Sequence, residues 1–214
     1  VDYGVDFKPE EVIITAGAKQ ALYNAAMVLF GPGDEVITHG PFWPSIGDQI
    51  KLADATPVIV QTHMEDGFTI HADPIIKAIT PKTKLVIVNS PNNPSGAVVP
   101  ENEAARILEL CASKGIWLLT DECYSHFLYD AKPWSVASLP GAKPNVLVAG
   151  TVSKTYAMTG WRLGYVHGPS EVIQTMIKLQ QYTFVCAPTP LQYASLAALD
   201  YDMSSYYSNY EQKR

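Results

Sequence analysis

The sequence predicts an α/β fold, a three-layer α/β/α sandwich with a mostly parallel sheet. Strand-like apolar runs alternate with helical segments along the whole chain, which is typical of a parallel sheet covered by helices on both faces. The central run at 84–89 (KLVIVN) is continuous and β-branched, the pattern of a strand buried on both faces. The crossovers between parallel strands are expected to be right-handed.

Each element has its own local signal. Short apolar runs predict strands at 12–15, 35–38, 57–60, 84–89, 116–120, 145–150 and 163–167. Helical composition predicts helices at 18–30, 45–53, 101–114, 170–182 and 188–199, and a short one that Asp73 caps and Pro74 begins. Gly31-Pro-Gly33 ends the first helix. Because ligands of such sheets bind beyond the carboxyl ends of the strands, residues that follow strands are the first candidates for a site.

Composition limits the class of protein. The chain has 214 residues, enough for one sizeable core or two small domains. With 47% hydrophobic and 17% charged residues, disorder is disfavoured. The net charge is −6 without a block of Lys or Arg, which argues against nucleic acid or an anionic membrane as the main partner. No apolar run is long enough to span a bilayer and no export signal is visible, so a cytoplasmic protein is predicted.

Cysteine and histidine spacing predicts no metal site. Cys111, Cys123 and Cys186 are odd in number and widely spaced, so reduced thiols are favoured over a disulfide framework or a zinc site. The five histidines show no ligand spacing and are interpreted as structural or surface residues. Among them only His126, near Tyr124, lies close to a candidate site.

The segment 151–162 (TVSKTYAMTGWR) is the most informative part of the chain. Lys154 follows the strand predicted at 145–150, so its amine is expected at a strand end rather than on a solvated face. A lysine there is either a structural oddity or a nucleophile that forms Schiff bases. The hydroxyls of Thr151 and Ser153 and the guanidinium of Arg162 suit a dianionic phosphate. An aldehyde-binding amine beside a phosphate cup indicates pyridoxal 5'-phosphate (PLP).

Four segments carry a resemblance to a known family: 16–22 (AGAKQAL), 89–96 (NSPNNPSG), 121–124 (DECY) and 153–165 (SKTYAMTGWRLGY). In this order they resemble the large domain of fold-type I PLP enzymes, most closely class I aminotransferases of the aspartate aminotransferase-like branch. The resemblance implies transfer of an amino group between an amino acid and a 2-oxo acid by a homodimer. A PLP-dependent C–S lyase uses the same domain, and a non-catalytic PLP-binding or dimerisation module is a third reading.

The resemblance also implies catalytic roles. Lys154 would bind PLP covalently and move the substrate proton, and Asp121 would pair with the pyridine nitrogen. Tyr124 and Asn93 would hydrogen-bond the phenolic oxygen of the cofactor. Without the family, Asp121 could equally cap a helix, and Asn93 lies in an ordinary turn sequence.

Further roles concern the phosphate and the ring. The phosphate would lie on the backbone amides of Ala18 and Lys19, in the turn that contains Gly17. Three side chains would also bind it, those of Thr151, Ser153 and Arg162. Taken alone, Gly17 could be an ordinary helix N-cap. Trp43 would stack on the pyridine ring, with Phe42 as the alternative, and Trp43 and Asn93 would also contact substrate. A tryptophan is otherwise most often part of a core.

Members of the family carry a second, smaller domain that supplies the arginine for the substrate carboxylate. Residues 1–199 are therefore predicted to be the PLP-binding large domain, and 200–214 the start of an interdomain helix that is cut short. The small-domain parts are expected to be absent from this sequence, which should impair the activity of the isolated chain.

Overall fold

The computed structural model describes residues 3–129 and 132–213. Its sheet has seven strands in the order β1-β7-β6-β5-β4-β2-β3. They are β1 (Val12–Thr15), β2 (Glu35–Gly40), β3 (Thr56–Gln61), β4 (Thr83–Asn89), β5 (Trp117–Asp121), β6 (Val146–Thr151) and β7 (Gly164–His167). β7 is antiparallel to both of its neighbours, whereas the pairs from β6 to β3 are parallel. The mostly parallel sheet is therefore confirmed.

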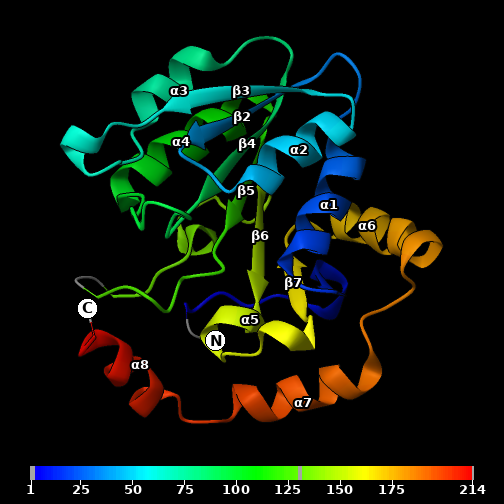
Figure 1. Cartoon of the computed structure of the whole chain (residues 1–214). Coiled ribbons are helices and arrows are strands. Elements are labelled where there is room, and N and C mark those ends of the chain that lie inside the picture. The colour runs from blue at the N-terminus through cyan, green and yellow to red at the C-terminus, as the bar shows by residue number, and fades with distance from the viewer. Residues whose placement is uncertain (1–2, 130–131, 214) are drawn as a thin grey trace.

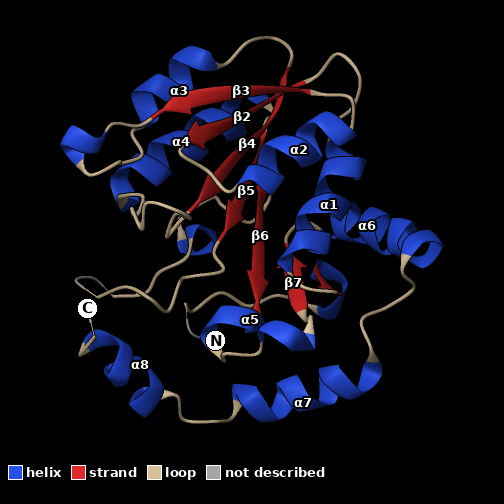
Figure 2. Ribbon diagram, viewed as in Figure 1, coloured by secondary structure: helices blue, strands red, loops and turns tan. Residues whose placement is uncertain are grey.

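Helices cover both faces of the sheet, as Figures 1 and 2 show. The helices are α1 (Ala18–Leu29), α2 (Pro44–Leu52), α3 (Ala72–Ala78), α4 (Glu101–Lys114), α5 (Val152–Thr155), α6 (Ser170–Thr183), α7 (Thr189–Leu199) and α8 (Ser204–Glu211). One core cluster joins the sheet to α1, α2 and α6, and a second joins it to α3 and α4. The three-layer sandwich is thus as predicted.

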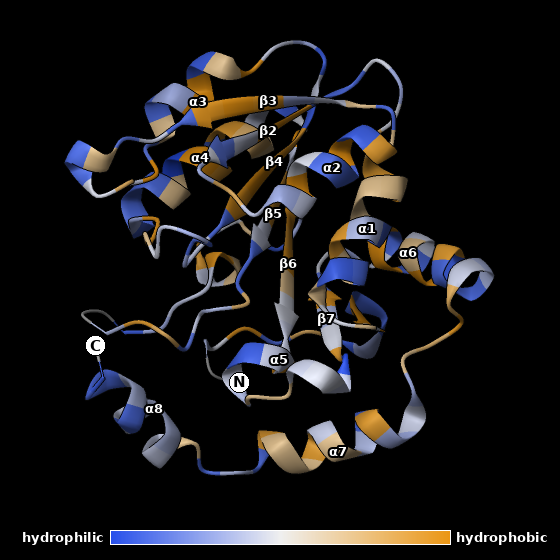
Figure 3. Cartoon of the chain, in the orientation of Figure 1, coloured by the Kyte–Doolittle hydropathy of each residue, from blue (hydrophilic) through white to orange (hydrophobic). Residues whose placement is uncertain are grey.

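The central strand β4 shows why a continuous apolar run forms here. Leu85 and Ile87 pack into the cluster with α1 and α2, whereas Val86 and Val88 pack into the cluster with α3 and α4. Successive side chains of a strand point to opposite faces, so a strand between two helical layers needs apolar residues at every position. Figure 3 shows β4 mainly in the hydrophobic colour.

The predicted cap of the third helix is wrong. The N-cap of α3 is His71, so Asp73 lies inside the first turn. The reason is non-local: Glu103 of α4 accepts a hydrogen bond from the Ala72 N–H (2.6 Å) and so supplies the capping acceptor.

None of the helices in the described ranges is both long and apolar enough to span a membrane.

The last two helices, α7 and α8, lie outside the sandwich (Figure 1). On α7, Tyr193, Leu196 and Leu199 are 70%, 58% and 61% exposed. α8 is fixed to the body by its tyrosines: the Tyr207 hydroxyl donates to the Thr155 carbonyl (2.9 Å), and Tyr206, Tyr207 and Tyr210 contact Phe127 edge-on.

Candidate active site

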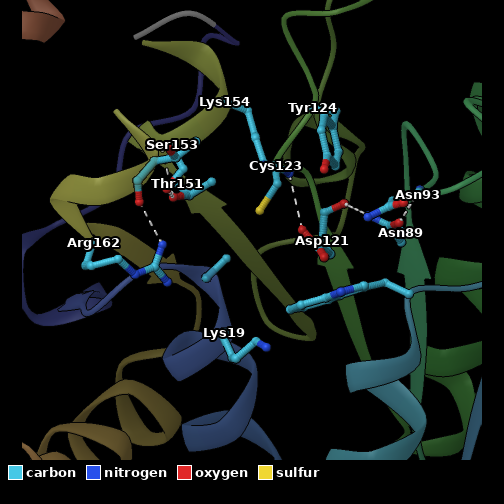
Figure 4. Close-up of a pocket in the computed structure, with 13 residues that line it drawn as sticks. Lys19, Asn89, Asn93, Asp121, Cys123, Tyr124, Thr151, Ser153, Lys154 and Arg162 are labelled. Carbon is cyan, nitrogen blue, oxygen red and sulfur yellow. Dashed lines mark hydrogen bonds between the residues drawn. The ribbon is translucent and has the colours of Figure 1, made fainter. Parts of the chain in front are cut away.

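A pocket of about 330 Å³ lies at the edge of the sheet where the parallel strands end. β7 runs against the others, so its first residues lie at this same edge. Segments far apart in the sequence meet there, as Figure 4 shows. The walls contain every predicted site residue except Gly17, together with Asn89, Cys123 and Thr159.

One end of the pocket is cationic. Gly17, with φ +80°, turns the chain into α1, and the Arg162 guanidinium lies against this turn. Arg162 donates to the carbonyls of Thr159 (3.0 Å) and Ala16 (3.5 Å). The first N–H groups of a helix have no acceptor within it, and the helix dipole favours an anion at that end. A phosphate fits this place, although the role of each residue remains a prediction.

Gly17→Ala is expected to weaken this anion site. A Cβ there would lie 2.6 Å from Nη2 of Arg162, so the guanidinium must move. Loss of one charge-assisted hydrogen bond should lower the affinity for inorganic phosphate and for PLP by about 10–100-fold, measured by calorimetry. Gly141→Ala is the control, because its φ is +78° but nothing lies within 4 Å of the added Cβ. Equal losses in both variants would attribute the effect to backbone strain alone.

Lys154 is placed by a short helix that directly follows β6. Thr151 caps α5, because its Oγ1 accepts from the Ser153 N–H (3.1 Å), and the same hydroxyl lies 2.8 Å from the Leu163 carbonyl. The half-buried Lys154 points into the pocket, with Nζ 5.8 Å from the centre of the Tyr124 ring. The sequence predicted a strand end, and the structure adds the turn of helix that directs the amine.

Asp121, the last residue of β5, places a carboxylate at the bottom of the pocket. It is 4% exposed, and its Oδ1 accepts from the Cys123 N–H (3.2 Å). Burial raises the pKa of Asp121, and burial also raises the pKa of Tyr124. None of the ion pairs in the described part of the chain involves Asp121. A buried carboxylate favours a cationic partner, so a protonated ring nitrogen fits this position.

The wall opposite Lys154 is held together by Asn89. Its Oδ1 accepts from the Asn93 N–H (2.7 Å), and its Nδ2 donates to the Asp121 carbonyl (3.0 Å). Trp43 lines the pocket with the Lys19 amine 4.7 Å above its ring. The alternative aromatic, Phe42, instead packs over Gly47 of α2.

Sequence reasoning missed Asn89, Cys123 and Thr159. All three lie within motifs that were recognised in the sequence, but no role was assigned to them. Asn89 stands opposite Asp121 in the β4–β5 pairing, so pairing the two predicted strands is the signal that finds it. His126 is outside the pocket lining and stacks on Tyr207, with ring centres 5.8 Å apart. Among the residues that the structure describes, no group of three or more His, Cys, Asp or Glu side chains could hold a metal ion.

Known proteins resemble this chain in sequence. Residues 2–213 match the family model described as "Aminotransferase class I and II". The chain is 41% identical over 199 residues to an aspartate aminotransferase of Geobacillus stearothermophilus, covering 92% of this chain and 51% of that protein. It is 39% identical over 196 residues to an aspartate/prephenate aminotransferase of Thermus thermophilus, covering 92% and 50%.

Solved structures of aminotransferases have the same fold as this chain. The aspartate aminotransferase of Rhizobium meliloti superposes with a TM-score of 0.93 at 37% identity, covering 99% of this chain and 54% of that one. An aromatic aminotransferase of Pyrococcus horikoshii gives 0.93 at 36% identity, covering 99% and 57%. The chain spans about half the length of the curated relatives that it matches. The resemblance in the sequence is confirmed, and the chain belongs to the class I and II aminotransferase family.

Proposed function

We propose that the protein containing this chain transfers an amino group between an amino acid and a 2-oxo acid with PLP as cofactor. The observation that carries the proposal is that Lys154 and the buried Asp121 face one pocket, one end of which is cationic and lies at the N-terminus of α1. The aspartate aminotransferases among the relatives support it. A cytoplasmic homodimer, with 1–199 as cofactor domain and 200–214 beginning an interdomain helix, belongs to the same proposal.

When bound, PLP supplies an aldehyde carbon that takes up the amino group and a ring that accepts electrons. The Lys154 amine would hold the cofactor and, once released, carry a proton to and from the substrate Cα. The Asp121 carboxylate would keep the ring nitrogen protonated. Tyr124 and Asn93 would bind the phenolic oxygen, and the Trp43 indole would cover one face of the ring.

A turnover assay tests this function. The full-length protein is incubated with PLP, L-aspartate and a panel of 2-oxo acids, and the new amino and oxo acids are measured. We expect one amino acid to form for each aspartate consumed. In a parallel incubation with cysteine-like substrates, release of ammonia and a thiol would instead indicate a C–S lyase. A change of cofactor absorbance without turnover would indicate a binding module.

A further inference from the structure

His39 is a buried histidine just outside the pocket, at the end of β2. It is 1% exposed, and its Nε2 accepts a hydrogen bond from the Asn89 N–H (3.1 Å). The ladder between β2 and β4 ends at Thr38 and Ile87, so beyond it the imidazole takes the place of a strand carbonyl. Because the acceptor nitrogen must offer a lone pair, the ring proton is on Nδ1.

The hydrogen bond that His39 accepts acts on the pocket because its donor, Asn89, lines the pocket wall. The Asn89 side chain contacts both the Asn93 N–H and the Asp121 carbonyl, at 2.7 Å and 3.0 Å. Asn93 and Asp121 are the two residues proposed to bind the phenolic oxygen and the ring nitrogen of the cofactor. His39 holds the backbone N–H of Asn89, and the Asn89 side chain in turn positions Asn93 and Asp121.

The imidazole is suited to be a permanent acceptor. Burial lowers the pKa of His39 to about 4, so the ring is neutral at pH 7 and its Nε2 lone pair stays available. A protonated ring offers donors only and could not accept the Asn89 N–H.

We propose that His39 is a positioning residue of this pocket, which fixes the end of β4 so that Asn93 and Asp121 keep their places toward the cofactor. The proposal rests on the proposed function in one respect, namely that Asn93 and Asp121 bind the cofactor. The hydrogen bond to Asn89 does not depend on that function. The competing explanation is that His39 only fills space, in which case an apolar side chain of similar size would serve equally.

The test compares His39→Leu, which fills space without an acceptor, with His39→Gln, which restores an acceptor. His167→Leu is the matched control, because His167 also has a pKa lowered by burial to about 4 but lies on β7 against Phe7. The first measurement is amide hydrogen exchange at Asn89 in the unliganded full-length protein. We expect exchange about tenfold faster in His39→Leu, the effect of one hydrogen bond, and a rate near wild type in His39→Gln.

The second measurement is the affinity for PLP, followed by absorbance. We expect about tenfold weaker binding in His39→Leu, with recovery in His39→Gln and no change in His167→Leu. Faster exchange with unchanged PLP affinity would overturn the positioning role. Failure of the wild-type protein to bind PLP would instead refute the proposed function. Should His39→Leu not fold, nitrogen NMR of the wild-type ring decides, because an Nε2–H tautomer at pH 7 overturns the proposal.

Discussion

Lys154→Ala should abolish the borohydride-reducible bond between the full-length protein and PLP. The side chain is the pocket amine directed inward by α5, and it stands beside the Tyr124 ring. The loss of its general acid–base role alone should lower amino transfer by about 10²–10⁴-fold. The phosphate end does not depend on this amine, so part of the PLP should still bind without a covalent bond. Reduction followed by peptide mapping measures the bond directly.

Lys19→Ala is the control, since Lys19 is the other lysine in the pocket lining. Its amine lies over the Trp43 ring, on the exposed side of α1. Reduced cofactor should still be found on the peptide that contains Lys154. Label on Lys19 in the wild-type protein, or a reducible bond that survives in Lys154→Ala, would show that the assignment is wrong.

The strands were predictable because burial on both faces leaves a strong local pattern. β4 needs an apolar residue at every central position, and its bounds, Thr83–Asn89, differ from the prediction by one residue. The place of the pocket was predictable for a related reason, whereas its individual residues were assigned through the family resemblance. In a parallel sheet every strand delivers its following residue to the same edge, so motifs placed after strands must meet there.

What the sequence could not supply depends on pairing between distant segments. Nothing local to 163–167 indicates that β7 runs against its neighbours, yet this direction brings Arg162 to the turn at Gly17. The link from His39 to Asn89 likewise joins two strand ends that are 50 residues apart in the chain. The predicted cap at Asp73 was wrong for the same reason, since Glu103 of another helix supplies the acceptor.

Asp121→Asn should separate function from stability. In the full-length protein the neutral amide cannot stabilise a protonated ring nitrogen, whose pKa should fall by about 1–3 when an opposite charge within about 4–6 Å is lost. Proton abstraction from the substrate should then slow by orders of magnitude, although PLP still binds through its phosphate. Single-turnover kinetics and a pH titration of the cofactor absorbance measure both effects. An unchanged single-turnover rate would count against this role.

The same substitution should stabilise the unliganded fold. Burial raises the pKa of Asp121 above its unfolded value, so the folded protein binds its proton more tightly than the unfolded chain. The ionised carboxylate therefore costs stability above the unfolded pKa of about 3.9, and this cost disappears as the pH falls below that value. In urea unfolding, Asp121→Asn should exceed wild type in free energy of unfolding at pH 8, and the difference should shrink toward pH 4.

Glu122→Gln is the matched control for both results. Burial raises the pKa of Glu122 to about 7, but its carboxylate accepts from Thr120 (2.9 Å) and the Val136 N–H (3.1 Å), away from the pocket lining. Relief of a buried charge should follow the same dependence on pH, while single-turnover rates stay near wild type. If Asp121→Asn instead destabilises the unliganded protein at pH 8, the carboxylate already has a partner that stabilises its charge. A cationic cofactor ring would then not be needed to compensate the charge of this buried carboxylate.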